Sequence, residues 1–169
     1  MSALSILPFH PSRAALFDSI NRAWIEEMFG VEPVDDVVLR APQTHIMDQG
    51  GDILFVADRG DGSGEEILGT GALKSWGPGI FELTKMGVIE AAQGKKAGET
   101  LLKTLITRAQ ELGATTLFLL TNSACEPALH LYEKNGFVHS AEIAERFGKT
   151  YDRCNVAMEY PNLRKQAAQ

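Results

Sequence analysis

The segment from Glu82 to Phe137 constrains the fold of this 169-residue chain more than any other part of it. An apolar stretch at 80–88 leads into a loop at 93–98 that contains two glycines, and a helical pattern then precedes the apolar run Leu117–Leu120. A continuous apolar run of this kind is typical of a strand buried on both faces. Since two strands joined through a helix form a crossover, we expect the two strands to lie parallel in one sheet.

The helix between these strands is predicted from apolar spacing. Its apolar residues fall on one helical face, and Gly113 follows where a C-terminal cap is expected. These residues are Leu101, Leu102, Leu105, Ile106, Ala109 and Leu112. The face that they form must pack on a sheet.

The rest of the chain supplies the other elements of one α/β domain over residues 1–169. Strand composition appears at 4–9, 52–57, 67–73, 137–143 and 155–160. Helical spacing appears at 13–29 and 33–39, and the Ser123-x-x-Glu126 pattern before Pro127 predicts a capped helix running through Lys134. The expected fold is a mixed, mostly antiparallel sheet of about seven strands with a parallel β-α-β crossover and about four flanking helices.

Charge and cysteine content exclude several classes of function. The formal net charge is −6 and no long Lys/Arg run occurs, which argues against nucleic acid or an anionic membrane as the main partner. The two cysteines, Cys125 and Cys154, lack disulfide or zinc spacing, so we expect no metal. No signal peptide or membrane-spanning run is apparent, so we expect a soluble cytoplasmic protein.

The loop Gln93-Gly94-Lys95-Lys96-Ala97-Gly98 has the features of an anion site. The first turn of a helix carries unpaired backbone N–H groups and the positive end of the helix dipole, both of which favour phosphate. Gly94 and Gly98 allow close backbone approach, and Lys95 and Lys96 add positive charge. The alternative is an ordinary turn with solvated lysines.

This loop, followed by Ala128-Leu129-His130-Leu131-Tyr132-Glu133-Lys134-Asn135-Gly136-Phe137, resembles the GNAT superfamily of N-acetyltransferases. The resemblance covers about a third of the chain and implies acetyl-CoA as co-substrate, with its pyrophosphate on the loop. The family loop usually reads Gln/Arg-x-x-Gly-x-Gly/Ala, and Lys96 replaces the central glycine here. A side chain at that position is strained if the backbone requires a positive φ.

The resemblance also implies a set of cofactor contacts. The pantetheine arm is expected to pair with the strand at Met86 and Val88, and Gly87 between them indicates a bulge or close approach. The expected cofactor-binding residues are Met86, Gly87, Val88, Gln93, Gly94, Lys95, Lys96, Ala97, Gly98, Glu99, Asn122 and Tyr132. Asn122 has an alternative role as a cap before the next helix.

Two residues are the catalytic candidates. Only about one lysine-like amine in a thousand is neutral at pH 7, so a carboxylate that accepts a proton assists attack, and Glu82 is our candidate base. The alternative is that Glu82 is a solvent-facing strand residue or forms a structural ion pair with Lys85. In the resembled family, a tyrosine at the position of Tyr132 often protonates the departing thiolate, and the alternative is a core aromatic residue.

The amine acceptor is the least constrained part of the prediction. By resemblance, Trp24, Glu27, Phe29 and Arg153 line its pocket, with Tyr151 and Asp152 nearby, and Arg153 either holds a substrate carboxylate or forms a surface ion pair. The expected reaction is direct acetyl transfer to a primary amine of a small molecule, amino acid or peptide. The rival functions are a non-catalytic acyl-CoA-binding sensor and a partner-binding module. A homodimer is compatible with the resemblance.

Overall fold

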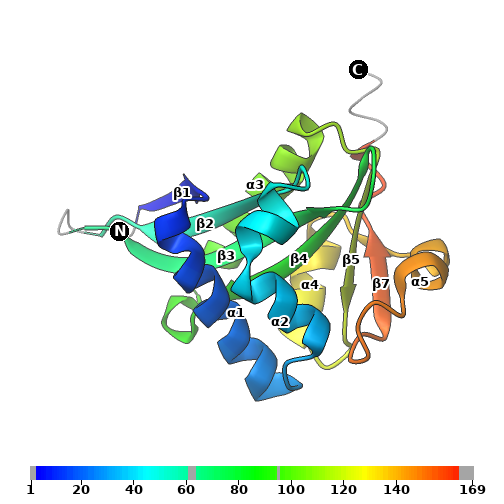
Figure 1. Ribbon diagram of the computed structural model, residues 1–169, viewed down its shortest axis with the longest axis horizontal. Coiled ribbons are helices and arrows are strands. Elements are labelled where there is room, and N and C mark those ends of the chain that lie inside the picture. The colour runs from blue at the N-terminus through cyan, green and yellow to red at the C-terminus, as the bar shows by residue number, and fades with distance from the viewer. Residues whose placement is uncertain (1–2, 61–63, 95, 164–169) are drawn as a thin grey trace.

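The computed structural model describes residues 3–60, 64–94 and 96–163 and contains one seven-stranded sheet (Figure 1). The spatial order is β1-β2-β3-β4-β5-β7-β6. The only parallel pair among the described strands is β4 with β5, and the other pairs are antiparallel. The strands are β1 (Leu4–Pro8), β2 (Asp52–Asp58), β3 (Glu66–Ser75), β4 (Ile80–Val88), β5 (Thr116–Thr121), β6 (Val138–His139) and β7 (Val156–Glu159).

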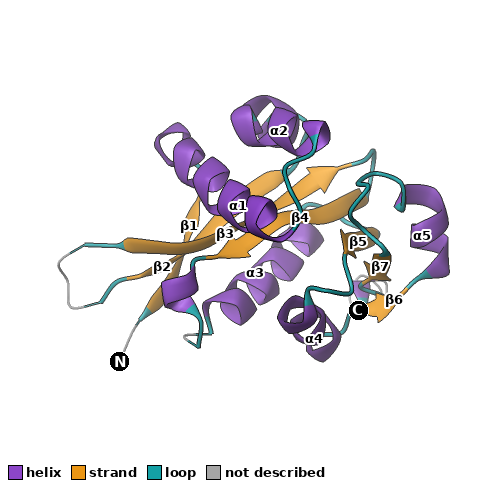
Figure 2. Ribbon diagram, turned by 90° about the horizontal axis from the view of Figure 1, so that it is seen from below, coloured by secondary structure: helices purple, strands orange, loops and turns teal. Residues whose placement is uncertain are grey.

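Helices cover both faces of this sheet (Figure 2). The helices α1 (Ala14–Met28) and α2 (Pro33–Arg40) lie over one face, and α3 (Ala97–Glu111) and α4 (Glu126–Lys134) lie over the other. A fifth helix, α5 (Ala141–Phe147), packs beside β7. None of the helices in the described ranges combines the length and apolar character needed to cross a membrane.

Side chains of β4 and β5 alternate between two cores. Leu83 and Leu119 belong to the core under α3, whereas Phe118 packs with α5 in a separate cluster. Because successive strand residues point to opposite faces, Glu82 and Thr84 lie on the face opposite Leu83. This is the face that α1, α2 and α5 cover. The two faces therefore present different chemistry along the same strand.

The strands β4 and β5 part in the middle of the molecule. Their parallel pairing ends at Leu83 and Leu119, five residues before β4 ends at Val88. The β3–β4 register shifts at the same level, and Lys85 has a φ of 50°. This irregularity is a bulge, and a bulge bends its strand. The predicted departure from regular pairing near Gly87 is thus confirmed, with the strained residue two positions earlier.

The predicted fold class is confirmed, with corrections at its C-terminal end. The strand expected at 137–143 is wrong beyond His139, because Ser140 accepts a hydrogen bond from the Ile143 amide at 3.2 Å and caps α5. Five α-helices are therefore described instead of about four. The capping box at Ser123 and Glu126 does not form, since the amide of Ser123 is bonded to Asn155. The boundaries of the domain, residues 1–169, stay a prediction.

Candidate active site

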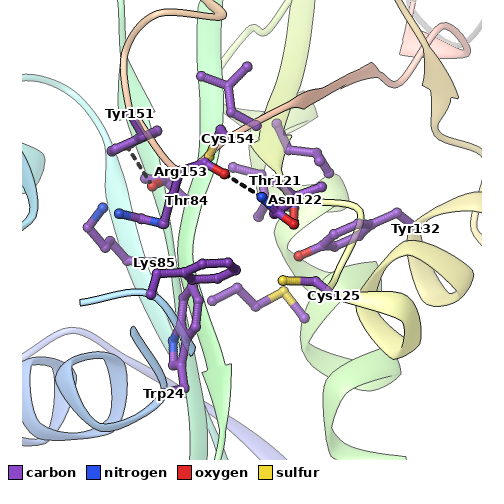
Figure 3. A pocket seen from close by; sticks show the side chains of 15 residues that line it. Trp24, Thr84, Lys85, Thr121, Asn122, Cys125, Tyr132, Tyr151, Arg153 and Cys154 are labelled. Carbon is purple, nitrogen blue, oxygen red and sulfur yellow. Dashed lines mark hydrogen bonds between the residues drawn. The ribbon is translucent and has the colours of Figure 1, made fainter. Parts of the chain in front are cut away.

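A small cavity of about 50 Å³ occupies the gap between β4 and β5 (Figure 3). Tyr132 and Cys125 line it from the α4 side of the sheet, whereas Thr84 and Tyr151 line it from the opposite side. We call it the central cavity. It connects the two faces of the sheet at the level where the strands part.

Tyr132 enters the central cavity from α4. Its ring packs edge-on against Phe137 with centroids 5.9 Å apart, and the residue is 9% exposed. Within the described residues, its hydroxyl makes no hydrogen bond to protein. Burial raises the pKa of this phenol far above its usual value, so the hydroxyl keeps its proton at neutral pH. The position and protonation state are those of a proton donor, although the catalytic role itself stays a prediction.

Glu82 is buried and lies behind the wall of the central cavity. Its carboxylate accepts hydrogen bonds from Trp76 Nε1 and from Tyr151 Oη, both at 3.0 Å. The alternative that Glu82 is a solvent-facing strand residue is wrong, because only 1% of it is exposed. The ion pair suggested with Lys85 is also wrong, since the Lys85 ammonium pairs with Asp35 at 2.8 Å.

Four charged residues form a cluster beside Tyr151. The Lys85 ammonium contacts one oxygen of Asp35, and the Arg153 guanidinium contacts both Asp35 oxygens and Glu32 at 2.6 to 3.0 Å. Both cations also lie over the Tyr151 ring, at 4.6 and 4.8 Å from its centroid. We call Glu32, Asp35, Lys85 and Arg153 the charged cluster. It ties α2 to β4 and to the segment before β7.

Burial and pairing act in opposite directions on these charges. Burial opposes ionisation of Asp35, but its bonds to Arg153 and the charge of Lys85 outweigh that effect and hold the pKa of the carboxyl below its usual value. Burial lowers the pKa of the Lys85 ammonium, and Asp35 counteracts part of that change. Removal of either partner would leave a buried charge without compensation.

The predicted acceptor residues are only partly brought together. Trp24, Phe29 and Arg153 line the central cavity, whereas Glu27 lines a neighbouring groove of about 600 Å³ along α1. The indole of Trp24 covers Gly87 so closely that a Cβ there would lie 2.5 Å from Trp24 Cδ1. Arg153 is already bonded to the carboxylates of Glu32 and Asp35, as the ion-pair alternative predicted. These ion pairs are largely buried and do not lie at the surface.

The predicted cofactor residues lie on the α3 and α4 side. A groove of about 470 Å³ runs from Val88 along the loop to the start of α3, and Pro127, Leu131 and Lys134 of α4 form its other wall. From the loop and the first turn of α3, it is lined by Gln93, Gly94, Lys96, Ala97, Gly98 and Glu99. Lys95 lies outside the described residues. We call this the loop groove.

The start of α3 leaves its first amides available. Lys96 is the N-cap residue, has a φ of 62°, and makes no capping bond with its side chain. The positive φ that would strain a side chain at the family's glycine position is therefore observed, with a lysine at that position. The Glu99 carboxylate points to Lys134 at 3.1 Å and Asn135 at 3.3 Å, and the bond from Lys134 lowers its pKa. It therefore does not cap the helix amides itself.

Two further cofactor candidates differ in their surroundings. Met86 lines the central cavity just after the bulge, beyond the last β4–β5 pair. Asn122 donates to the carbonyl of Arg153 and accepts from the amide of Ala124 at 2.8 Å. Its amide group therefore joins the segment after β5 to the segment before β7, and it does not cap α4, whose N-cap residue is Cys125.

Several site residues escaped the sequence prediction. Thr84, Lys85 and Asp35 were not predicted for the site, and Tyr151 was placed near it without a role. Their partners lie 50 to 118 positions away in sequence, so no local spacing signals them. Among residues 3–60, 64–94 and 96–163, no group of three or more His, Cys, Asp or Glu is arranged to hold a metal ion.

Comparison with known proteins identifies the family. The model of the acetyltransferase (GNAT) family matches residues 15–137, so the chain belongs to this family. The uncharacterized N-acetyltransferase YvbK of Bacillus subtilis is 32% identical over 90 residues, which are 53% of this chain and 58% of YvbK. The chain thus matches little more than half the length of this curated relative.

Two solved structures have the same fold. A GNAT-family acetyltransferase from Staphylococcus aureus superposes with a TM-score of 0.78 at 20% identity, covering 93% of this chain and 98% of that one. The structure of yncA from Salmonella typhimurium, described with its cofactor acetyl-CoA, has a TM-score of 0.67 at 20% identity and covers 82% of each chain. At these identities, the likeness supports the fold alone.

Proposed function

We propose that this protein transfers the acetyl group of acetyl-CoA directly to a primary amine in a ternary complex. The observation that carries the proposal is the central cavity, which opens between β4 and β5 and meets different chemistry on each face. On the α4 face stands a protonated phenol, Tyr132, and on the other stands Tyr151, bonded to the carboxylate of Glu82. Proton donor and proton acceptor are thus separated by the width of the sheet.

The loop groove supports acetyl-CoA as the acetyl donor. The amides of Ala97, Gly98 and Glu99 begin α3 without a side-chain cap, and such amides are good partners for a pyrophosphate. A Cβ on Gly98 would lie 3.5 Å from Leu131 Cδ2, so the glycine keeps the groove open next to α4. Lys96 adds positive charge to this groove on a chain of net charge −6, whereas Lys134 is paired with Glu99.

The residues around the central cavity divide the proposed chemistry. The amine attacks the thioester carbon, a C–N bond forms, and the C–S bond breaks. Backbone amides at Met86 to Val88, beyond the last β4–β5 pair, are candidates to bind the developing oxyanion. Tyr132 gives its proton to the departing thiolate, and Glu82 takes a proton that the amine loses.

Charge around the cavity favours a cationic group on the acceptor. Among the residues around the central cavity, the three carboxylates Glu32, Asp35 and Glu82 lie beside the two buried cations Lys85 and Arg153, so this group carries a net negative formal charge. A protonated amine is attracted by such a site. We keep Trp24, Glu27 and Phe29 as acceptor contacts, whereas Arg153 binds a substrate carboxylate only if it gives up part of its bonding to Glu32 or Asp35.

The test is a binding measurement followed by an amine panel. Calorimetry with acetyl-CoA should show binding, and release of free thiol should then require a primary amine from a panel of polyamines, amino acids and peptides. Binding without turnover would instead support an acyl-CoA sensor, and the absence of both would support a partner-binding module. We also propose a cytoplasmic location, which the two free cysteines favour.

A further inference from the structure

A chain of three hydrogen-bonded groups connects Glu82 to the central cavity. Tyr151 Oη donates to Glu82 Oε2 at 3.0 Å and lies 3.2 Å from Thr84 Oγ1. Thr84 and Tyr151 line the cavity, whereas Glu82 is not among its lining residues. Of the dashed lines in Figure 3, the one at Tyr151 marks the Thr84–Tyr151 contact at the cavity wall. An amine in the cavity therefore meets hydroxyl groups before it meets the carboxylate.

The surroundings hold this chain in one orientation. Trp76 Nε1 occupies the second oxygen of Glu82 at 3.0 Å, so Oε2 is left for Tyr151. Lys85 and Arg153 lie over the Tyr151 ring, and both are anchored by the buried carboxylate of Asp35. With so many partners, the Tyr151 ring has little freedom to rotate away, and its hydroxyl remains between the threonine and the carboxylate.

We propose that Thr84 and Tyr151 form a proton relay that carries the amine proton to Glu82, an inference that rests on the proposed acetyl transfer. The substrate ammonium gives one proton to Thr84 Oγ1, the Thr84 hydroxyl proton passes to Tyr151 Oη, and the Tyr151 proton passes to Glu82 Oε2. The amine becomes neutral and Glu82 becomes a carboxylic acid, while both hydroxyl groups are regenerated. Thr84 is then the catalytic group that touches the amine.

The rest of the reaction balances with this step. After attack on the thioester, the new C–N bond leaves the nitrogen with one excess proton, and the thiolate takes a proton from Tyr132. The excess nitrogen proton restores the Tyr132 phenol, and Glu82 releases its proton to solvent through the same relay. One proton is released per turnover, as amide formation from an ammonium requires.

The relay is tested by three single variants and their combination. Glu82→Gln, Tyr151→Phe and Thr84→Val should each lower kcat near pH 7 by about 10²-fold, the scale of a lost general base. Each loss should shrink toward about pH 10, where an acceptor of pKa about 10.4 is substantially neutral without help. Because the three groups act as one unit, Glu82→Gln combined with Tyr151→Phe should lose no more activity than the worse single variant.

The pH profile can be assigned to the relay only if the charged and titratable groups around it are the same in every variant. The groups around the relay are Lys85 on β4, Glu32 and Asp35 at α2, and Arg153 and Cys154 next to Tyr151. Calorimetry with acetyl-CoA and thermal melting of each variant will show that these neighbours and the fold are retained. Thr84→Ser, which keeps the hydroxyl, should recover most of the activity that Thr84→Val loses.

The outcomes separate the relay from the proposed function. Wild-type turnover together with an unchanged rate and pH profile for Thr84→Val would overturn the relay and leave acetyl transfer intact. Losses that multiply in the double variant would also overturn it, because they would show independent roles. Wild-type protein that releases no thiol with any amine would overturn both the relay and the acetyl transfer on which it rests.

Discussion

The two sides of the central cavity are built in different ways. On the α3 and α4 side, the loop groove takes its backbone amides and glycines from the short segment 93–99, and α4 forms its other wall. The opposite side relies on side chains from α2, β4 and the residues before β7, joined through the charged cluster. In the proposed function, the first side binds acetyl-CoA and the second side binds the amine acceptor.

The strongest test of this contrast is Asp35→Asn, which removes one buried charge and keeps the shape. Lys85 and Arg153 would then lack their shared carboxylate, and breaking a buried pair in this way costs about 3 to 5 kcal/mol of unfolding free energy. Urea denaturation measures the loss. Arg40→Ala, in an exposed pair with Asp36, is the control and should leave the denaturation midpoint unchanged.

Acid sensitivity gives a second reading of the same variant. The folded-state pKa of Asp35 lies below its unfolded value of about 3.9, so its stabilising contribution is complete above that value and is lost as the pH falls through the folded pKa. The stability of Asp35→Asn should therefore fall less steeply than that of wild type below about pH 4. Equal slopes would show that Asp35 is not the group that titrates.

Tyr132→Phe tests the opposite side of the cavity. The change keeps the edge-on packing against Phe137 and removes the hydroxyl group that would donate the proton. We expect kcat to fall by about 10²-fold or more while acetyl-CoA affinity is retained. Unlike the loss in Glu82→Gln, this one should persist at high pH, because a neutral amine does not replace the acid. An unchanged kcat in an assay limited by chemistry would remove Tyr132 from the mechanism.

Gly98→Val tests the loop groove. The branched side chain would crowd Leu131 and Val88, whose nearest carbons lie 3.5 and 3.7 Å from an ideal Cβ, and would push into the groove. Loss of one charge-assisted bond to phosphate corresponds to about a tenfold or greater rise in Kd, which calorimetry resolves. Gly98→Ala is the matched control and should bind nearly as well as wild type. If Gly98→Val bound acetyl-CoA with the affinity of wild type, the loop would not be part of the binding site.

Lys96 has the smallest expected effect and separates backbone strain from charge. Its φ of 62° is a conformation that costs a non-glycine residue about 1 to 2 kcal/mol, so Lys96→Gly should leave stability equal or higher by up to about 1 kcal/mol. Lys96→Glu should weaken acetyl-CoA binding, because it places negative charge beside the proposed phosphate site. Equal affinities for all three proteins would show that the lysine points into solvent.

The local sequence pattern predicted the loop groove better than it predicted the charged cluster. The bounds of β4 and the start of α3 follow from apolar runs and glycines within a few residues, and even the strained Lys96 could be anticipated from the family loop. By contrast, the bond between Asp35 and Arg153 spans 118 positions, and only the folded sheet brings the two together. The strand predicted at 137–143 was wrong beyond His139 because the Ser140 side chain caps α5, and this cap outweighs the strand composition of the segment.

The most direct test of the account is a crystal structure with coenzyme A bound. We predict that the pyrophosphate contacts the amides of Ala97 to Glu99, and that the thiol enters the central cavity from the α3 and α4 side within hydrogen-bonding distance of Tyr132 Oη. Thr84 should then remain open to an amine from the other face. A thiol that reaches the cavity from the α1 side, or that lies away from Tyr132, would contradict the division of roles between the two faces.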